Sequence, residues 1–305
     1  MYDIITIGSA RVDVIVKTKG PIKKIENKKH HDIAHHLGEK LLIEDLLFTT
    51  SGGGTNSAIA FSRLGLKTAF VGCIANDMNG EFVAKELKKE NVEFLGKVKQ
   101  GQTGYSVIIP GRNESTILRY KGVNNSLLFQ DIHFPLETKW LYISSLPEES
   151  FEAIEKIALE GKKQGIKIAL NIGEYLAKQG LNKLKRILKI VDIFILNKEE
   201  AAILTDKARL KQMLETLAEH TNAVIVITNE EDAISALSGK IIYTKHIAKI
   251  NPIDKTGAGD AFASGFVYGM MAGKGVETSL NFGHKQALSV ISSLGAKSNL
   301  LRELK

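Results

Sequence analysis

The strongest local signal in this 305-residue chain is the stretch Asn251-Pro252-Ile253-Asp254-Lys255-Thr256-Gly257-Ala258-Gly259-Asp260-Ala261-Phe262. Residues 254–256 are typical of a strand exit, and Gly257-Ala258-Gly259 allows a tight turn in which a ligand can approach the backbone. A helix follows at once, and its free N–H groups and positive dipole end make an anion-binding site. Asp260 lies inside the first helical turn, so we expect it to face the same pocket.

This combination of an anion hole and a carboxylate suits phosphoryl transfer to an alcohol. The N–H groups would stabilise charge on a γ-phosphate, and the Asp260 carboxylate would accept the hydroxyl proton. The motif by itself also fits a simpler interpretation, in which Asp260 only caps a helix after a glycine-rich loop.

A second glycine-rich segment, Ser51-Gly52-Gly53-Gly54-Thr55-Asn56, opens a helix that we expect to run through Gly65. Three consecutive glycines before a helix expose backbone N–H groups to a ligand. Asn56 can both donate and accept hydrogen bonds, as polyol recognition requires. A glycine run alone is equally compatible with a flexible loop.

From about residue 139 onward, strands and helices alternate. The expected strands are 140–143, 166–171, 193–196 and 224–228, and the expected helices are 150–163, 175–188, 198–204, 210–220, 259–272 and 276–294. This rhythm predicts an α/β fold, with a doubly wound, mostly parallel sheet and helices on both faces. Such sheets bind ligands at the carboxyl ends of their strands.

Three β segments, at about 9–16, 41–50 and 104–120, do not fit this rhythm. We expect them to form a small second sheet that covers one edge of the main domain and acts as a lid over the strand ends. Segment 41–50 looks like a short strand pair. The whole chain, 1–305, is expected to form a single domain with this lid as an appendage.

Residues 17–40 are rich in Lys and His and are expected to form an exposed loop or insertion. A metal site is an alternative there, but no carboxylate or cysteine completes a recognisable ligand set around His30, His31, His35 and His36. The single cysteine, Cys73, excludes an intrachain disulfide and is expected to be a small core residue.

Charge and composition limit the possible partners. The formal charge of +7 suits anionic ligands such as nucleotides, although a solvated surface is the simpler interpretation. No aromatic array interleaves with the basic residues and no zinc-ligand spacing appears, so nucleic-acid binding is not expected. No apolar run approaches the roughly 20 residues that span a bilayer, and the first residues lack a signal-peptide pattern. We therefore expect a cytoplasmic protein without a membrane partner.

Together, the two glycine segments resemble the paired signatures of the ribokinase-like (PfkB) family of carbohydrate and nucleoside kinases. The first resembles that family's Gly-Gly-x-x-x-Asn segment, which ends in Arg63-Leu64-Gly65 here. The second matches its Asp-x-Thr-Gly-Ala-Gly-Asp segment from Asp254 to Asp260. Further matches in the family's order are Asn197-Lys198-Glu199-Glu200, residues 121–125, and Gly295-Ala296. The resemblance thus covers essentially the whole chain.

The resemblance implies an ATP-dependent kinase that phosphorylates a hydroxymethyl group of a small sugar, with a nucleoside as the alternative acceptor. Mg²⁺ would accompany ATP, and a monovalent cation such as K⁺ is an option. For catalysis, the resemblance implies Asp260 as general base and Gly257, Ala258 and Gly259 as anion hole. The acceptor would be bound by Asp13, Gly52, Gly53 and Asn56, and the nucleotide by Asn197, Thr228, Glu230 and His284. Glu200 would hold Mg²⁺ through water, and Asp254 with the Thr256 carbonyl would hold the monovalent cation.

Two of these residues have simpler alternatives. Asn197 ends an expected strand and could serve only as the N-cap of the next helix. His284 could be an ordinary histidine on a helix face. Two exposed lid sheets could also pair into a homodimer, because pairing would remove their exposed edges.

One loop departs from the family pattern. Relatives usually have glycines at the positions of Glu230 and Ala233, in a loop that lies along the nucleotide. Carboxylates there would repel phosphates unless turned outward or bridged by metal, so nucleotide affinity and donor preference are open.

A catalytically silent ligand-binding protein is the rival from another class, although the intact Asp254 to Asp260 motif argues against it. A dinucleotide-dependent dehydrogenase is not expected, because no Gly-x-Gly-x-x-Gly follows the first strand.

Overall fold

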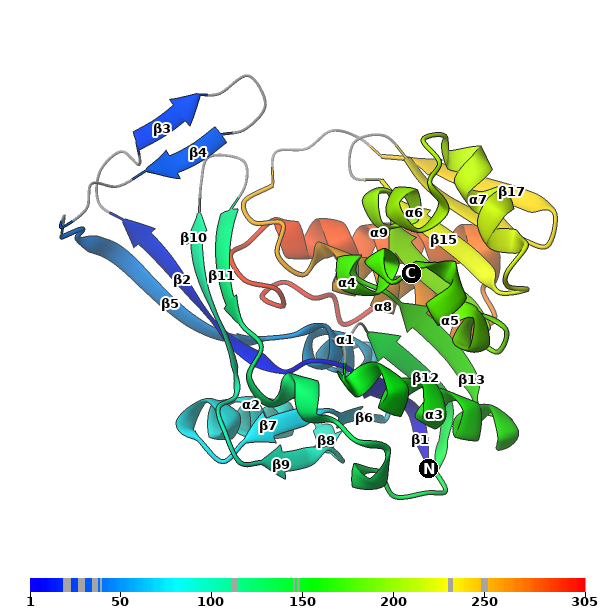
Figure 1. The fold of residues 1–305 in the computed structure, drawn as a ribbon, viewed down its shortest axis with the longest axis horizontal. Helices are drawn as coiled ribbons and strands as arrows, with labels where there is room; N and C mark the ends of the chain where they lie inside the picture. Colours follow the sequence, from blue (N-terminus) through cyan, green and yellow to red (C-terminus); the bar gives the residue numbers. More distant parts are fainter. Residues whose placement is uncertain are drawn as a thin grey trace.

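A nine-stranded sheet forms the centre of the molecule in the computed structural model (Figure 1). The structure describes residues 1–18, 23–26, 31–34, 38, 40–110, 115–144, 146, 149–229, 233–247 and 252–304. In order across the sheet, its strands are β17 (Ile241–His246), β16 (Ala233–Ser238), β15 (Val224–Thr228), β14 (Ile193–Asn197), β13 (Lys167–Asn171), β12 (Thr138–Ser144), β1 (Tyr2–Ile7), β6 (Thr68–Val71) and β8 (Val92–Phe94). From β8 to β15 every pairing is parallel, while β16 and β17 add antiparallel neighbours. The expected doubly wound, mostly parallel sheet is confirmed.

Helices cover both faces of this sheet because its strands are apolar on both sides. One face carries α3 (Glu149–Lys163), α4 (Glu174–Lys178), α5 (Gly180–Leu188), α6 (Lys198–Thr205) and α7 (Leu210–Ala218). The other carries α1 (Gly53–Arg63), α8 (Ala258–Met271) and α9 (Gly275–Ile291). The helix α2 (Met78–Lys89) packs beside α1, and two short 3₁₀ helices, η1 (Gly122–Ser126) and η2 (Phe129–Asp131), precede β12.

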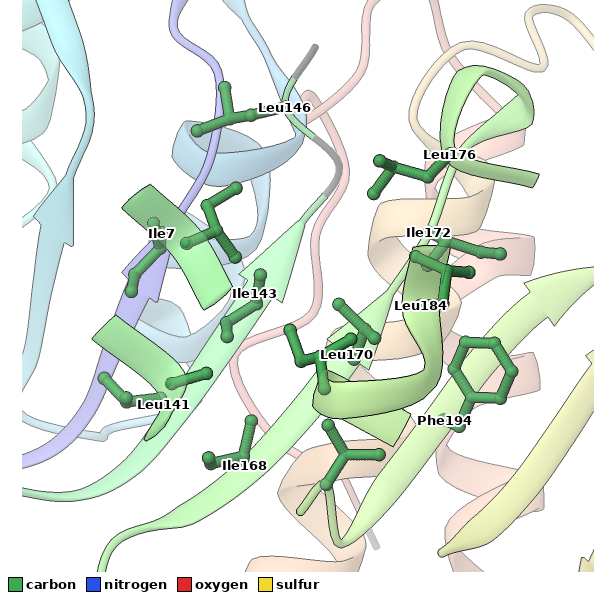
Figure 2. Packing of buried hydrophobic residues seen from close by; sticks show 14 of the residues in the cluster. Ile7, Leu141, Ile143, Leu146, Ile168, Leu170, Ile172, Leu176, Leu184 and Phe194 are labelled. Carbon is green, nitrogen blue, oxygen red and sulfur yellow. The ribbon is translucent and has the colours of Figure 1, made fainter. Parts of the chain in front are cut away.

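Alternation along each strand decides which face a side chain joins. In β12, Leu141 and Ile143 point to the α3 side, whereas Trp140 and Tyr142 point to the α8 side. Figure 2 shows the α3 side, where residues of β1, β12, β13 and β14 pack against leucines of α4 and α5. Because the strands from β8 to β15 are parallel, their carboxyl ends meet at one edge of the sheet.

The three outlying β segments do assemble into a second sheet, as expected. Its strand order is β11 (Ser115–Tyr120), β10 (Gly104–Pro110), β2 (Arg11–Thr18) and β5 (Ile43–Ser51). This small sheet projects from the main domain beyond the carboxyl ends of the central strands (Figure 1). A further short pair, β7 (Cys73–Ala75) with β9 (Lys97–Lys99), lies at its root. Cys73 is buried, as expected, and burial raises the pKa of its thiol to about 12.

Several element boundaries differ from the expectations. Residues 43–50 of the expected strand pair 41–50 belong to the single long strand β5, which pairs with β2 from Ile43 to Ser51. The expected loop 17–40 contains a hairpin of β3 (Lys23–Glu26) and β4 (His31–Ala34). The expected helix 175–188 is two helices, because Gly180 has a φ of 78° that interrupts the helical path.

His30, His35 and His36 lie outside the described residues, as does the side chain of His31. No helix within the described ranges has the length and apolarity needed to cross a membrane.

Candidate active site

The glycine turn before α8 depends on a backbone shape that only glycine adopts easily. Gly257 is the N-cap of α8 with a φ of 81°, and a Cβ atom there would lie 2.5 Å from the carbonyl oxygen of Ala296. Asp254 fixes the same turn, because its two carboxylate oxygens accept hydrogen bonds from the N–H groups of Thr256 and Gly295, each at 2.9 Å. The turn is thus tied directly to the chain's C-terminal segment.

The start of α8 presents free N–H groups, as the sequence predicted, but not from all three residues of the turn. The Ala258 N–H already donates to the Lys255 carbonyl at 3.2 Å. The N–H groups of Gly257 and Gly259 form no hydrogen bond with another described residue. A Cβ atom at Gly259 would meet no atom within 4 Å, so the space beside it is open. An anion could therefore reach Gly257 and Gly259.

Asp260, the third residue of α8, contacts the second glycine-rich segment. The Nδ2 atom of Asn56 in α1 donates to Asp260 Oδ2 at 2.8 Å, across 204 residues of sequence. Asn56 is 3% exposed, and its Oδ1 is buried without a hydrogen-bond partner among the described residues. The amide thus orients the carboxylate and leaves one acceptor available for a ligand.

Electrostatics make Asp260 a stronger base than an ordinary aspartate. Burial raises its pKa, and the nearby charge of Asp13 raises it further. The Asn56 hydrogen bond and the guanidinium groups of Arg11 and Arg119 act in the opposite direction, and burial outweighs them. A carboxylate with a raised pKa is better matched to accepting a proton near neutral pH.

The glycines at the start of α1 have a packing role that the sequence did not reveal. Gly52 has a φ of 119°, and a Cβ atom there would lie 2.3 Å from the Ser9 carbonyl oxygen. A Cβ atom at Gly53 would lie 2.0 Å from Ser144 Oγ and 3.3 Å from Asp260 Oδ1. The Gly53 N–H already donates to Ser9 Oγ at 3.2 Å. These glycines therefore let α1 approach the ends of β1 and β12.

That position is the topological switch point of the sheet. β1 pairs with β6 on one side and with β12 on the other, so the chain winds in opposite directions from it. Open α/β sheets bind ligands in the crevice beyond the carboxyl ends of strands at such a point. Asn56, Asp260 and the Gly257 turn all lie there.

One wall of the cleft at this site is the inner face of the small sheet. Asp13 in β2 is 1% exposed and accepts a hydrogen bond from Arg11 Nε at 2.9 Å. Arg11 also donates through Nη2 to Ser51 Oγ at 3.2 Å. Arg119 of β11 lines the cleft with both residues. The cleft has a volume of about 790 Å³, which is large enough for a sugar and part of a nucleotide.

The opposite wall and floor come from the main domain. Glu174 of α4 and Glu199 of α6 line the far side, and residues 252–257 line the floor up to the turn before Asp260. The structure thus brings Asp13, Asp254, Thr256 and Gly257 to one cleft. Lys255 lines it as well.

The sequence missed Arg11 and Arg119 as candidate site residues. Arg11 could have been found, because it lies two positions before Asp13 in a strand and so shares its face. Arg119 could not, since its place beside Asp13 depends on the register of two strand pairings that the sequence does not specify.

The expected nucleotide residues Asn197 and Thr228 end adjacent parallel strands in register. Asn197 also forms a capping box, in which its Oδ1 accepts from the Glu200 N–H at 2.7 Å and Glu200 Oε2 accepts from the Asn197 N–H at 2.8 Å. The simpler helix-cap role of Asn197 is therefore real. Burial raises the pKa of Glu200 to about 7, with a further contribution from the charges of Glu174 and Glu199.

The remaining nucleotide candidates lie apart from the cleft. His284 is partly buried in α9, and burial together with the charge of Lys245 lowers its pKa. Asn197, Thr228, Glu200 and His284 do not line the cleft beside Asp13. Glu230 lies outside the described residues. Within those residues, no cluster of three or more His, Cys, Asp or Glu side chains is arranged to hold a metal ion.

A mostly parallel α/β sheet with a small projecting sheet and a site at the switch point defines a ribokinase-like fold. The family described as pfkB family carbohydrate kinase matches residues 2–303. The chain therefore belongs to this family of ATP-using sugar and nucleoside kinases, and it is a phosphotransferase.

Known relatives agree with this assignment. The ribokinase of Haemophilus influenzae is 26% identical over 275 residues, which cover 86% of this chain and 88% of that protein. The crystal structure of adenosine kinase from Sinorhizobium meliloti superposes with a TM-score of 0.82 at 22% identity, covering 98% of this chain and 97% of that one. A putative ribokinase II from E. coli in complex with ATP and Mg²⁺ gives a TM-score of 0.81 at 15% identity, covering 98% and 96%.

Proposed function

We propose that the protein transfers the γ-phosphoryl group of ATP to a hydroxymethyl group of a small sugar, with Asp260 as the general base. The observation that carries this proposal is the Asn56–Asp260 hydrogen bond at the open N-terminus of α8. It places an oriented carboxylate of raised pKa beside the unused N–H groups of Gly257 and Gly259.

The proposed step is an in-line displacement. The Asp260 carboxylate takes the hydroxyl proton, the hydroxyl oxygen forms the new bond to the γ-phosphorus, and the bond from that phosphorus to the β–γ bridging oxygen breaks. ADP leaves with the bonding electrons. Gly257 and Gly259 stabilise the charge on the transferring group, and the Ala258 N–H would join them only if its bond to Lys255 opened.

Asp13 and Asn56 are proposed to bind acceptor hydroxyls. Asp13 is nearly fully buried on the cleft wall, and Asn56 offers its unpartnered Oδ1. Gly52 and Gly53 shape this end of the pocket by their lack of side chains. We propose that the small sheet acts as a lid, because it forms a whole wall of the cleft and can exclude water from the reaction.

Asn197, Thr228, Glu230 and His284 are proposed to bind the nucleotide, and Glu200 to hold Mg²⁺ through water. Mg²⁺ keeps several water ligands and takes one or two carboxylates together with substrate phosphates, so a protein cage of three ligands is not required. Glu174 and Glu199 lie near enough for their charges to act on Glu200, so a Mg²⁺ ion held through water at Glu200 would bind where negative charge is already concentrated. When bound, Mg²⁺ would neutralise charge on the β- and γ-phosphates.

Two further proposals concern a monovalent cation and the cellular location. A K⁺ site at Asp254 and the Thr256 carbonyl is supported by the place of both residues in the lining of the cleft. Both Asp254 oxygens accept backbone hydrogen bonds, so a cation would be added to a carboxylate that the turn already orients. A cytoplasmic location is supported by the use of ATP and by the single buried thiol. Turnover that is equal in KCl and in choline chloride would remove the K⁺ proposal.

The test of the function is a panel of acceptors with ATP–Mg²⁺, followed by ADP release. The panel should include pentoses, hexoses, sugar acids, sugar phosphates and nucleosides. We expect at least one sugar to raise ADP release well above the rate without acceptor. A nucleoside as the best acceptor would correct the substrate class. Acceptor binding without ADP release from any compound would support a catalytically silent protein instead.

We also propose a homodimer formed through the small sheet. Its outer face, opposite the cleft, exposes Leu46 and Phe48 of β5 and Leu118 and Tyr120 of β11, each more than 45% accessible. An apolar sheet face of this kind is normally covered. Sedimentation should show a dimer at micromolar concentration and a monomer for the double variant Phe48→Glu/Leu118→Glu. A wild-type monomer would contradict the dimer.

A further inference from the structure

The inner face of the small sheet carries a row of polar side chains directly beside the catalytic end of the cleft. Strand pairing places Asp13 opposite Ser106, and Ser106 opposite Arg119. Paired residues in neighbouring strands point to the same face, and Arg11 shares the face of Asp13 because it lies two positions before it. All four side chains line the cleft.

The next row along the same face is apolar. It consists of Ile15, Ile108 and Ile117, which are paired across β2, β10 and β11 and also line the cleft. The polar row is therefore confined to the end nearest Asp260, where the acceptor must lie if the proposed function is correct. Two guanidinium groups, those of Arg11 and Arg119, lie within this one short row, and only that of Arg11 is paired with the carboxylate of Asp13.

Among the described residues, Arg119 has no counter-ion in direct contact. No carboxylate of a described residue lies within 4.0 Å of its guanidinium, and it makes no hydrogen bond to another described residue. Arg11 has its Nε committed to Asp13 and its Nη2 to Ser51. Partial burial and the neighbouring charge of Arg11 lower the pKa of Arg119, while Asp13 and Asp260 raise it. Its five donors therefore remain available to a ligand.

The other charges of the cleft are placed elsewhere. Glu174 and Glu199 lie on the far wall, on the α4 and α6 side. Asp254 has both oxygens committed to backbone N–H groups, and Lys255 lies on the floor. The acceptor end of the cleft therefore has one ion pair, Arg11 with Asp13, the general base Asp260, and the guanidinium of Arg119, which no carboxylate of a described residue contacts directly although Asp13 and Asp260 are near enough for their charges to act on it.

We infer that the acceptor carries an anionic oxygen group, a carboxylate or a phosphate, which Arg119 binds through its planar pair of donors while Asp13 and Asn56 bind hydroxyls. Guanidinium matches both groups in a two-bond geometry, and such charge-assisted contacts are about twice as strong as neutral ones. This inference rests on the proposed function, since it names the class of acceptor for the same site.

Matched pairs of acceptors provide the test. Gluconate is compared with glucitol, its neutral open-chain counterpart, and fructose 6-phosphate with fructose, by ADP release with ATP–Mg²⁺. Each pair differs in charge at one position, so the two pairs separate a carboxylate from a phosphate. The variants are Arg119→Gln and the control Arg209→Gln, an exposed arginine remote from the cleft. Binding of the same four compounds without ATP is measured by calorimetry.

We expect the wild-type protein to prefer one anionic acceptor over its neutral partner by about tenfold or more in kcat/KM, as a charge-assisted contact implies. Arg119→Gln should reduce that preference about tenfold, mainly through KM, and Arg209→Gln should keep it. Calorimetry should show the same loss of preference in binding.

Three results would overturn the inference. In the first, neither anion binds or reacts better than its neutral partner. In the second, Arg119→Gln leaves the preference intact. In the third, Arg119→Gln lowers kcat equally for charged and neutral acceptors, which would assign Arg119 to the transferring phosphoryl group. Preferential binding of an anion without any ADP release would contradict the kinase proposal alone, so the two failures are distinguishable.

Discussion

At the scale of single residues, the contact between Asn56 and Asp260 links two glycine-rich segments that the sequence suggested independently. A buried carboxylate costs free energy when it is charged, and one amide donor compensates only part of that cost. The raised pKa of Asp260 is therefore a consequence of where the fold places it. The Asn56 amide and the guanidinium groups of Arg11 and Arg119 offset the burial of this charge only in part.

Replacing Asn56 with alanine should shift the pH dependence of turnover. The Asn56 hydrogen bond favours the charged form of Asp260, so its loss should raise the pKa of Asp260 further. If Asp260 acts as the base, the acid limb of the kcat/KM profile should move to higher pH. Asn299→Ala, which removes an exposed amide contact to Ser292, should leave the limb unchanged. A limb that stays in place, or moves to lower pH, in Asn56→Ala would contradict Asp260 as the titrating group.

The sequence predicted the site residues that lie within one contiguous motif. It missed the residues that reach the site only through the register of strand pairing. Asp260 follows from a glycine turn and a helix start that are contiguous in sequence. Arg119 meets Asp13 only through two strand pairings. The sequence showed the glycines at the start of α1, but only the structure shows why side chains do not fit there. The backbone approaches Ser9 and Ser144 too closely for a Cβ atom.

At the scale of elements, the turn before α8 should be very sensitive to substitution. Gly257→Ala combines left-handed backbone strain with a clash against Ala296, whereas Gly273→Ala has a similar φ of 68° and meets no atom within 4 Å. The control should lose about 1–2 kcal/mol from strain alone, and Gly257→Ala should lose more. Denaturant titration of both variants checks this. Equal losses would show that Ala296 moves away without cost.

The capping box at α6 predicts a pH-dependent stability. Burial raises the folded-state pKa of Glu200 to about 7, above its unfolded value, so its stabilising contribution is complete below the unfolded pKa and is lost as pH rises through 7. Glu200→Gln keeps a capping side chain without the charge. Its free energy of unfolding, relative to wild type, should increase by about 3 kcal/mol between pH 4.5 and pH 8.

Denaturant titrations at both pH values check this prediction, with the exposed Glu219→Gln as control. If the difference in free energy of unfolding between Glu200→Gln and wild type is the same at both pH values, the charge of Glu200 does not destabilise the folded protein.

Helices and strands were predicted correctly where the apolar pattern was strong. The prediction failed where pairing with a strand far away in sequence determines whether a strand forms and where it ends. The strand 224–228 was predicted with the boundaries that β15 has, because its apolar run is short and bounded by polar residues. The strands β16 and β17 were missed, since antiparallel edge strands break the strand–helix rhythm. Segment 41–50 was divided in two because its full-length partner, β2, lies far away in sequence.

At the scale of the whole molecule, the small sheet and the main domain are joined by a buried charge that no motif indicated. Lys297, 4% exposed, donates to the Thr50 carbonyl at 2.7 Å and to Glu86 at 2.7 Å. It thus connects the C-terminal segment with β5 and α2. The same segment supports the turn before Asp260 through Gly295 and Ala296, so the root of the small sheet and the catalytic turn share one anchor.

The central claim is that Asp260 is the base that activates the acceptor, and Asp260→Asn tests it most directly. The substitution keeps shape and removes a buried charge, so folding should be maintained or improved at pH 7. Single-turnover measurement of ADP formation with saturating acceptor and ATP–Mg²⁺ should show a rate lower by about 10²–10⁴, with acceptor binding retained. A rate within tenfold of wild type would contradict the account.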